Sequence, residues 1–160
     1  MIALAEAKGI ISTRESTPNA AGRLLAIDLG TKRVGVAVCD ELQIAVRPLP
    51  AIDRRSWKDL LSRVADFIAS SKAQGLVIGL PLSLAGAEGS AAKSARAIAA
   101  KFSQSLAVPV YLQDERLTTF AARSHLKSVA RSEREIEIEV DSEAAAIILR
   151  DFIVSNRLAG

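Results

Sequence analysis

Hydrophobic and turn-forming residues follow a regular pattern from residue 24 onward. LLAID at 24–28 predicts a buried strand, GTKR at 30–33 a tight turn, and VGVAVCD at 34–40 a second strand with its valines on one face. Together these segments predict a β-hairpin whose first strand ends at Asp28.

The rest of the chain shows strand and helix patterns in alternation. Short apolar runs of strand length stand between longer segments in which apolar residues recur three and four positions apart. The expected elements are a third strand over 44–52 that Pro48 and Pro50 make irregular, a helix after Ser56 with Asp59 as a capping box, a strand over 76–80, a helix over 91–106, a strand over 108–113, and helices over 118–129 and 142–155. This order predicts an α/β fold with a mixed five-stranded sheet and helices on both faces.

The first 22 residues lack such periodicity. They include the turn-rich stretch STPNAAG. We therefore expect residues 1–22 to be a flexible N-terminal extension and residues 23–160 to form one domain. A chain of 160 residues is long enough for a sizeable hydrophobic core.

Composition excludes several classes of protein. Hydrophobic residues make up 49% of the chain and charged residues 24%, as in ordinary globular proteins. No apolar run reaches the roughly 18 residues of a transmembrane helix, and Met1–Arg23 lacks the apolar core of a secretion signal. We expect a cytoplasmic protein with no membrane partner.

Cysteine and histidine each occur once, which restricts the chemistry. The lone Cys39 excludes an internal disulfide and a cysteine-rich zinc site, and its place at the end of an apolar strand predicts a small core residue. A Ser–His–Asp hydrolase would need His125, but the helical spacing of His125 with apolar neighbours favours a packing or surface role. Metal chemistry in this chain would use oxygen ligands, which favours Mg²⁺ or Mn²⁺ over zinc.

Three acids stand where an apolar segment meets a turn or a helix start: Asp28, Glu115 and Asp141. Asp28 and Glu115 end predicted strands, at the sheet edge where α/β proteins bind ligands. Asp141 is expected to begin the last helix, which can pack against the same edge. Three converging carboxylates would repel one another unless cations compensated them. Two divalent ions would do so and could support phosphodiester hydrolysis.

Each acid also has a structural interpretation. Asp28 is compatible with a turn residue before Gly30, and Glu115 with a surface acid paired with Arg116. Asp141 is compatible with a residue that caps the last helix or favours its dipole. The pattern alone leaves these alternatives open.

Basic residues are concentrated in the first third of the chain, although the net charge is only +3. They are Lys32, Arg33, Arg47, Arg54, Arg55 and Lys58. Such a face either attracts a polyanion or is a solvated surface. The glycines of the 30–35 turn permit close approach of a phosphate, which Thr31, Lys32 and Arg33 could contact; a purely structural tight turn is the alternative.

The segments IDLGTKRVGVAV, VIGLPL, AGAEG, DERLTT and VDSEAAAIIL occur in an order that resembles the YqgF family, also called RuvX or Holliday junction resolvases. The resemblance spans about residues 24–153. It implies a ribonuclease H-like fold and a metal-dependent phosphodiesterase that acts on structured nucleic acid. Family members are linked to processing of the 5′ end of precursor 16S ribosomal RNA in bacteria.

The resemblance also implies roles for individual residues. Asp28, Glu115 and Asp141 match the catalytic acids proposed for the family and would ligate the metal ions. The expected substrate-binding residues are Thr31, Lys32, Arg33, Arg116 and Thr118. The expected partner is nucleic acid, with precursor ribosomal RNA favoured over branched DNA and with pre-ribosomal particles as its setting. The chain would act as a monomer or homodimer.

The chain departs from the family pattern in three places. The loop after GLPL has Ser83, Ala85 and Ala87 where relatives have Asn, Asp and Thr. The segment SEREIEIEVD is acidic rather than lysine-rich, and its alternation of apolar residues and glutamates predicts a short edge strand. Ala144 stands where related junction resolvases have a fourth acid, so a weaker metal site is expected.

Parts of the sequence also fit three other functions. One is a junction-specific DNA resolvase, and another is a non-catalytic RNA-binding factor in ribosome assembly. The third is a sugar kinase or actin-like ATPase, whose first hairpin also contains D-L-G-T. That class needs two such domains around its nucleotide, which 160 residues cannot supply.

Overall fold

The computed structural model describes residues 10–11, 20–83, 86–115 and 133–159, and within these ranges the side chains of 10–11, 133–141 and 159 are left out. The N-terminal extension therefore lies mostly outside the described residues, and its flexibility stays a prediction. The helix expected over 118–129, with His125, lies outside them too.

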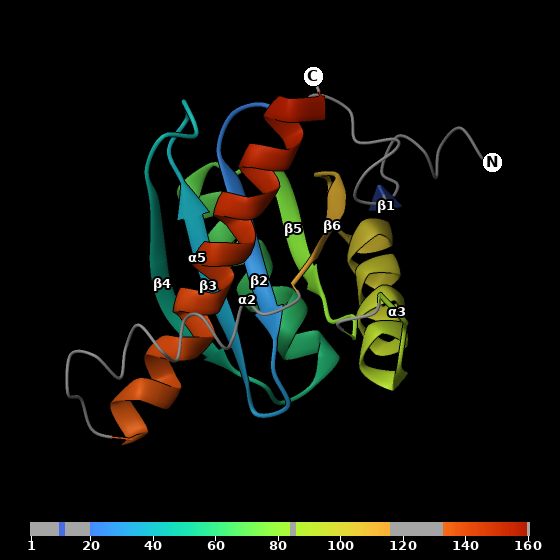
Figure 1. Cartoon of the computed structure of the whole chain (residues 1–160). Coiled ribbons are helices and arrows are strands. Elements are labelled where there is room, and N and C mark those ends of the chain that lie inside the picture. Colours follow the sequence, from blue (N-terminus) through green and yellow to red (C-terminus); the bar gives the residue numbers. More distant parts are fainter. Residues whose placement is uncertain (1–9, 12–19, 84–85, 116–132, 160) are drawn as a thin grey trace.

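One mixed sheet forms the centre of the molecule (Figure 1). Its strands lie in the order β1-β6-β5-β2-β3-β4. Their bounds are β1 Ile10–Ile11, β2 Leu24–Leu29, β3 Arg33–Cys39, β4 Val46–Asp53, β5 Gly75–Leu80 and β6 Val110–Asp114. Strand β3 pairs antiparallel with β2 and with β4, while β5 pairs in parallel with β2 and β6.

The five strands expected from the sequence are confirmed, and β1 adds a sixth. Ile10 and Ile11 pair in parallel with Val110 and Tyr111 of β6. A pairing of two residues is too short to produce a recognisable alternation, so the pattern could not predict it.

Helices cover both faces of this sheet, as expected for a ribonuclease H-like fold. Helices α2 (Trp57–Ser71) and α3 (Ser90–Ser105) lie on one face, and α5 (Glu133–Ala159) crosses the other. The predicted cap of α2 is confirmed, because the Ser56 hydroxyl accepts a hydrogen bond from the Asp59 N–H at 3.1 Å.

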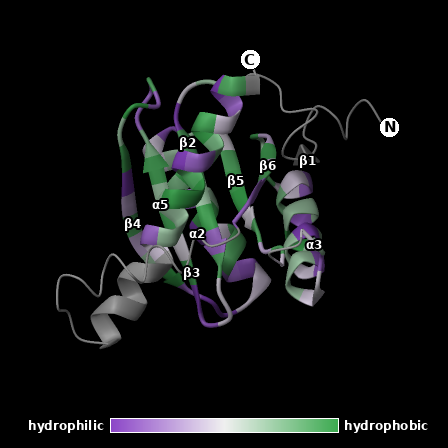
Figure 2. Ribbon diagram, in the orientation of Figure 1, coloured by the Kyte–Doolittle hydropathy of each residue, from purple (hydrophilic) through white to green (hydrophobic). Residues whose placement is uncertain are grey.

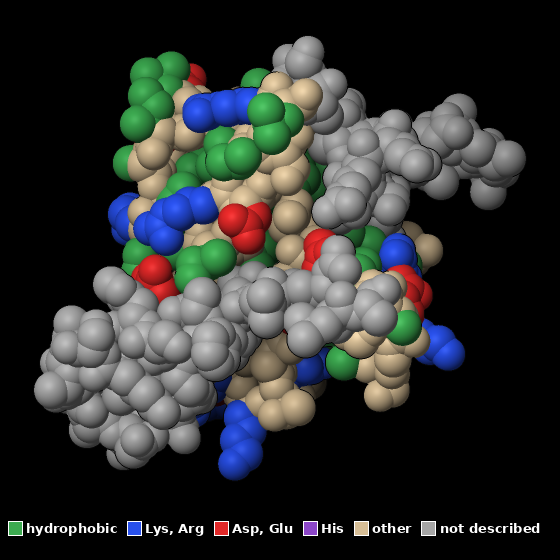
Figure 3. Space-filling view, in the orientation of Figure 1, with side chains coloured by type: hydrophobic (Ala, Val, Ile, Leu, Met, Phe, Trp, Pro, Cys, Tyr) green, Lys and Arg blue, Asp and Glu red, His purple; other side chains and the backbone are tan. Residues whose placement is uncertain are grey.

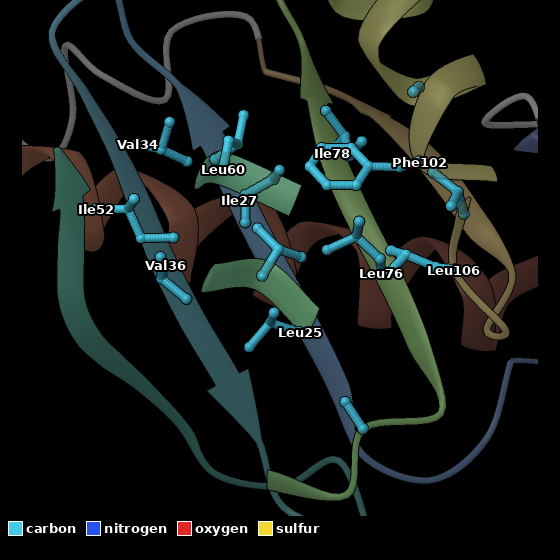
Figure 4. Close-up of a cluster of buried hydrophobic side chains, with 14 of the residues drawn as sticks. Leu25, Ile27, Val34, Val36, Ile52, Leu60, Leu76, Ile78, Phe102 and Leu106 are labelled. Atoms are coloured by element: carbon cyan, nitrogen blue, oxygen red, sulfur yellow. The ribbon is translucent and has the colours of Figure 1, made fainter. Parts of the chain in front are cut away.

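Alternation along the strands divides the core into two layers. Leu25 and Ile27 of β2 pack under α2 and α3, whereas Leu24 and Ala26 pack under α5. Figure 2 shows that the strands of the sheet are mainly hydrophobic, and Figure 4 shows the first layer between the sheet and its helices. Cys39 is buried in the second layer, which confirms its prediction as a small core residue.

The acidic segment 133–140 is helical, so the prediction of a short edge strand was wrong. Helix α5 begins at Glu133, and Asp141 lies about two turns inside it rather than at its start. Glutamate and arginine are good helix formers and isoleucine is tolerated. The structural alternative in which Asp141 caps the helix is therefore excluded.

The outer strand β4 is irregular, as Pro48 and Pro50 predict. Its pairing with β3 shifts register between Val34 and Val36, and both prolines lie on the strand that closes this side of the sheet. Prolines are typical of edge strands because they cannot donate to a ladder.

Large hydrophobic side chains are exposed at one end of the molecule. Among the described residues these are Leu42, Ile44, Val154 and Leu158. Arg157 links the two segments that contain them by donating hydrogen bonds to the carbonyls of Leu42 and Gln43, the latter at 2.9 Å. Figure 3 shows hydrophobic side chains gathered at this upper end, away from the carboxyl ends of β2 and β6.

Candidate active site

Two predicted acids meet at the carboxyl ends of parallel strands. Asp28 is the fifth residue of β2 and lies opposite Gly35 of β3. Glu115 directly follows β6, and its N–H donates to the Leu80 carbonyl at 3.2 Å. Strand β5 runs between β2 and β6, so the two carboxylates approach each other across its end.

Gly79 of β5 provides the space for this approach. A Cβ atom at Gly79 would overlap the Glu115 carboxylate and would lie 2.6 Å from Ile148 Cδ1 of α5. Any side chain would therefore displace the Glu115 carboxylate and the end of the Ile148 side chain. No sequence pattern indicates this role of Gly79, since it depends on which strands flank β5 in the sheet.

The surroundings of Glu115 oppose its ionisation. The pKa of Glu115 is raised to about 9, first of all by burial and in addition by the charge of the nearby Asp28 carboxylate and a hydrogen bond with it. The charge of Asp114 contributes to the same shift. At neutral pH Glu115 therefore keeps its proton beside Asp28, and a bound cation would favour its release.

A pocket of about 140 Å³ adjoins Glu115. Its lining comes from the β2–β3 turn, β5, the β4–α2 connection and the first half of α3. The lining residues are Leu29, Thr31, Arg54, Gly79, Pro81, Ala91, Ser94, Ala95, Ile98 and Glu115. The pocket thus brings a basic side chain, Arg54, to the edge where the acids lie.

The predicted phosphate contacts of the β2–β3 turn lie at the same edge. The Gly30 N–H donates to the Arg33 carbonyl at 3.0 Å and closes the turn. Thr31 and Lys32 are exposed, and half-buried Arg33 begins β3 opposite Asp53 of β4. Thr31 also lines the pocket. Arg116 and Thr118 lie outside the described residues.

The place of Asp141 follows from its neighbour in α5. The buried Ser142 hydroxyl donates to the Leu49 carbonyl at 2.6 Å and accepts from the Val36 N–H at 3.4 Å. These bonds fasten α5 where the β3–β4 pairing shifts register. The Asp141 side chain lies outside the described residues, so its approach to Asp28 and Glu115 stays a prediction.

The described acids fit part of a metal site. Within the residues described, no three His, Cys, Asp or Glu side chains are close enough to hold a metal ion. Asp28 and Glu115 form a pair of oxygen donors of the kind that Mg²⁺ and Mn²⁺ bind. Their mutual repulsion and burial fit a cation between them.

Comparison with known proteins identifies the family. Residues 22–155 match the RuvX family, described as Holliday junction resolvase. The chain belongs to the RuvX family. Within the described part of the chain, no helix combines the length and hydrophobicity needed to cross a membrane.

Individual relatives support this RuvX assignment. An Anaeromyxobacter protein with the provisional name pre-16S rRNA nuclease is 40% identical over 131 residues, 82% of this chain and 96% of the relative. A Synechococcus protein with the same provisional name is 38% identical over 133 residues, 83% of this chain and 89% of the relative. The chain is therefore a member of a nuclease family.

Among solved structures, RuvC of T. thermophilus in complex with a Holliday junction substrate is similar to this RuvX protein. Its TM-score is 0.47 at 16% sequence identity, and the match covers 83% of this chain and 94% of the RuvC chain.

Proposed function

We propose that this RuvX protein is a metal-dependent nuclease that hydrolyses phosphodiester bonds at the 5′ end of precursor 16S ribosomal RNA in the cytoplasm. The proposal rests on one observation above all: the Asp28 and Glu115 carboxylates face each other in the space beside Gly79. Family membership supports a nuclease, and the provisional names of the relatives support this RNA as substrate.

In this proposal Asp28, Glu115 and Asp141 hold two divalent ions, Mg²⁺ or Mn²⁺. When bound, such ions activate a water molecule and stabilise the leaving oxygen of a phosphodiester. Asp28 and Glu115 would supply carboxylate oxygens to these ions, and Glu115 would have to release its proton to do so.

Residues around the acids hold the substrate. Lys32 and Arg33 of the β2–β3 turn bind the phosphate backbone, together with Arg116 after Glu115, and Thr31 and Thr118 donate hydrogen bonds to it. The positive charges of Lys32, Arg33 and Arg116 offset the repulsion between a phosphate and the acidic pair. The nucleic acid is bound alone or within a pre-ribosomal particle, by a monomer or a homodimer.

Cleavage of defined RNA tests this function. Wild-type protein is expected to shorten precursor 16S RNA in Mg²⁺ or Mn²⁺ but not in EDTA, and to leave mature RNA intact. Asp28→Asn removes a charged metal ligand and should abolish cleavage while leaving thermal stability close to that of the wild type, because the amide oxygen can still accept the hydrogen bond from protonated Glu115.

Asp66→Asn is the matched control for that variant. Asp66 is exposed on α2, so Asp66→Asn is the same chemical change at a position away from the site. The cleavage rate of this variant should equal that of the wild type. Equal activity of Asp28→Asn and Asp66→Asn would overturn the assignment of the acids.

A second substrate deserves a parallel assay because the family is described as Holliday junction resolvase. Four-way DNA junctions are incubated under the same conditions as the RNA. Cleavage of junctions but not of RNA would replace the RNA substrate with branched DNA. Tight RNA binding without cleavage in either metal would support a non-catalytic assembly factor instead.

A further inference from the structure

Arg54 is a basic residue of the pocket that no sequence motif includes. It lies in the connection between β4 and α2, far in sequence from Asp28 and Glu115. Its side chain is half-buried and lines the pocket together with Thr31 and Glu115. This placement brings a positive charge into the same small space as Glu115, one of the two paired acids.

Two hydrogen bonds fix Arg54 to the β2–β3 turn. Its backbone N–H donates to the Lys32 carbonyl at 2.8 Å, and Nη1 of its guanidinium donates to the Gly30 carbonyl at 2.8 Å. The second bond holds the guanidinium beside the turn that follows Asp28. The position of Arg54 is therefore coupled to the position of the turn.

Most of the hydrogen-bonding capacity of this guanidinium is available to a ligand. A guanidinium has five N–H donors, and within the described residues Arg54 donates from Nη1 alone. Arg54 also forms no ion pair with the acids in the described part of the chain. A half-buried arginine with unused donors is suited to bind an oxyanion.

We propose that Arg54 binds a non-bridging oxygen of the substrate phosphate that lies over Asp28 and Glu115. This inference rests on the proposed nuclease function. The pocket of about 140 Å³ accepts a phosphate group beside the acids. Arg54 neutralises its charge there and orients it through two N–H groups, an arrangement that lysine cannot reproduce.

RNA with single methylphosphonates tests this contact. Each RNA replaces one non-bridging oxygen with a methyl group, which removes the charge of one phosphate. Binding is measured in Ca²⁺, which takes the same oxygen ligands. For the wild type, replacement at the phosphate in the pocket should weaken binding roughly 10- to 100-fold.

Arg54→Ala should weaken binding of unmodified RNA by the same factor, and the methylphosphonate at that phosphate should then cause no further loss. This pattern isolates the contact as a double-mutant cycle does. Arg54→Lys should bind more tightly than Arg54→Ala but less tightly than the wild type, because charge is kept and the paired donors are lost.

Arg55→Ala provides the charge-matched comparison. Arg55 is exposed and lies outside the lining of the pocket. Loss of the Arg55 side chain should weaken the binding of every RNA by a similar small factor. It should leave the effect of the methylphosphonate at the pocket phosphate unchanged. If the methylphosphonate weakened binding to Arg54→Ala as much as it weakens binding to the wild type, the inference would be overturned. This holds even if Arg54→Ala bound all RNAs weakly because the turn had loosened.

Failure of the inference can be separated from failure of the proposed function. If the wild type cleaves RNA but Arg54→Ala keeps the methylphosphonate effect, Arg54 does not contact the phosphate and the nuclease proposal stands. If the wild type neither cleaves nor binds RNA, the proposed function fails and the inference fails with it.

Discussion

At the scale of single residues, the missing side chain of Gly79 decides the geometry of the acidic pair. Asp28 and Glu115 come from strands that are separated by β5, and their carboxylates meet only because β5 presents a hydrogen atom there. A glycine in a strand usually costs stability. Here the glycine leaves room for the Glu115 carboxylate beside Asp28.

Gly79→Ala is therefore expected to damage both activity and stability. The new Cβ would overlap the Glu115 carboxylate and press on Ile148, so cleavage should fall sharply and the free energy of unfolding should drop by about 1–3 kcal/mol. RNA cleavage and urea unfolding measure the two effects.

Gly89→Ala is the control, because a Cβ there meets nothing within 4 Å. That variant should cleave RNA at the wild-type rate. An active Gly79→Ala protein would show that the Glu115 carboxylate can move without loss of cleavage. It would contradict the claim that cleavage requires the carboxylate in this position.

Single residues also show what the sequence could predict about the site. Asp28 and Glu115 were predicted because an acid at the end of an apolar strand is unusual without a function. Arg54 was recognised only as part of a basic region. Its place in the pocket depends on hydrogen bonds between two loops, and no local pattern contains that information.

At the scale of elements, patterns predicted the strands and α2 well but misplaced the start of α5. Alternation of isoleucine and glutamate over 136–140 resembles a strand, yet the segment is helical and continues through Ser142. The helix is held by tertiary bonds of Ser142 to Val36 and Leu49. Packing of this kind overrides local alternation.

The cap of α2 gives a testable prediction at this scale. Ser56→Ala removes the hydroxyl that accepts from the Asp59 N–H and should lower the free energy of unfolding by about 1 kcal/mol. Ser70→Ala, near the other end of the same helix, is the control. The exposed Ser70 hydroxyl only bonds back to Phe67, so its loss should leave stability nearly unchanged, as chemical denaturation can verify. Equal effects would contradict the role of the cap.

At the scale of the whole molecule, the proton on Glu115 links folding to pH. In the metal-free folded protein the pKa of Glu115 is about 9, against an ordinary value of 4.5. Between these values the unfolded chain has lost the proton while the folded chain keeps it, so folding stability falls as pH rises.

The slope of the free energy of unfolding against pH is measured by unfolding the protein in EDTA at a series of pH values between about 5 and 9. Glu115→Gln cannot ionise and should flatten it. Added Mg²⁺ should stabilise the wild type more at high pH than at low pH, because the ion binds the deprotonated carboxylate. Identical slopes for the wild type and Glu115→Gln would contradict the raised pKa.

The prolines of β4 have a consequence for the protein in a crowded cell. An outer strand with a full row of N–H donors invites strands of other molecules and can start aggregation. Pro48 and Pro50 remove donors from the strand that ends this side of the sheet, so this side is a poor template for misassembly.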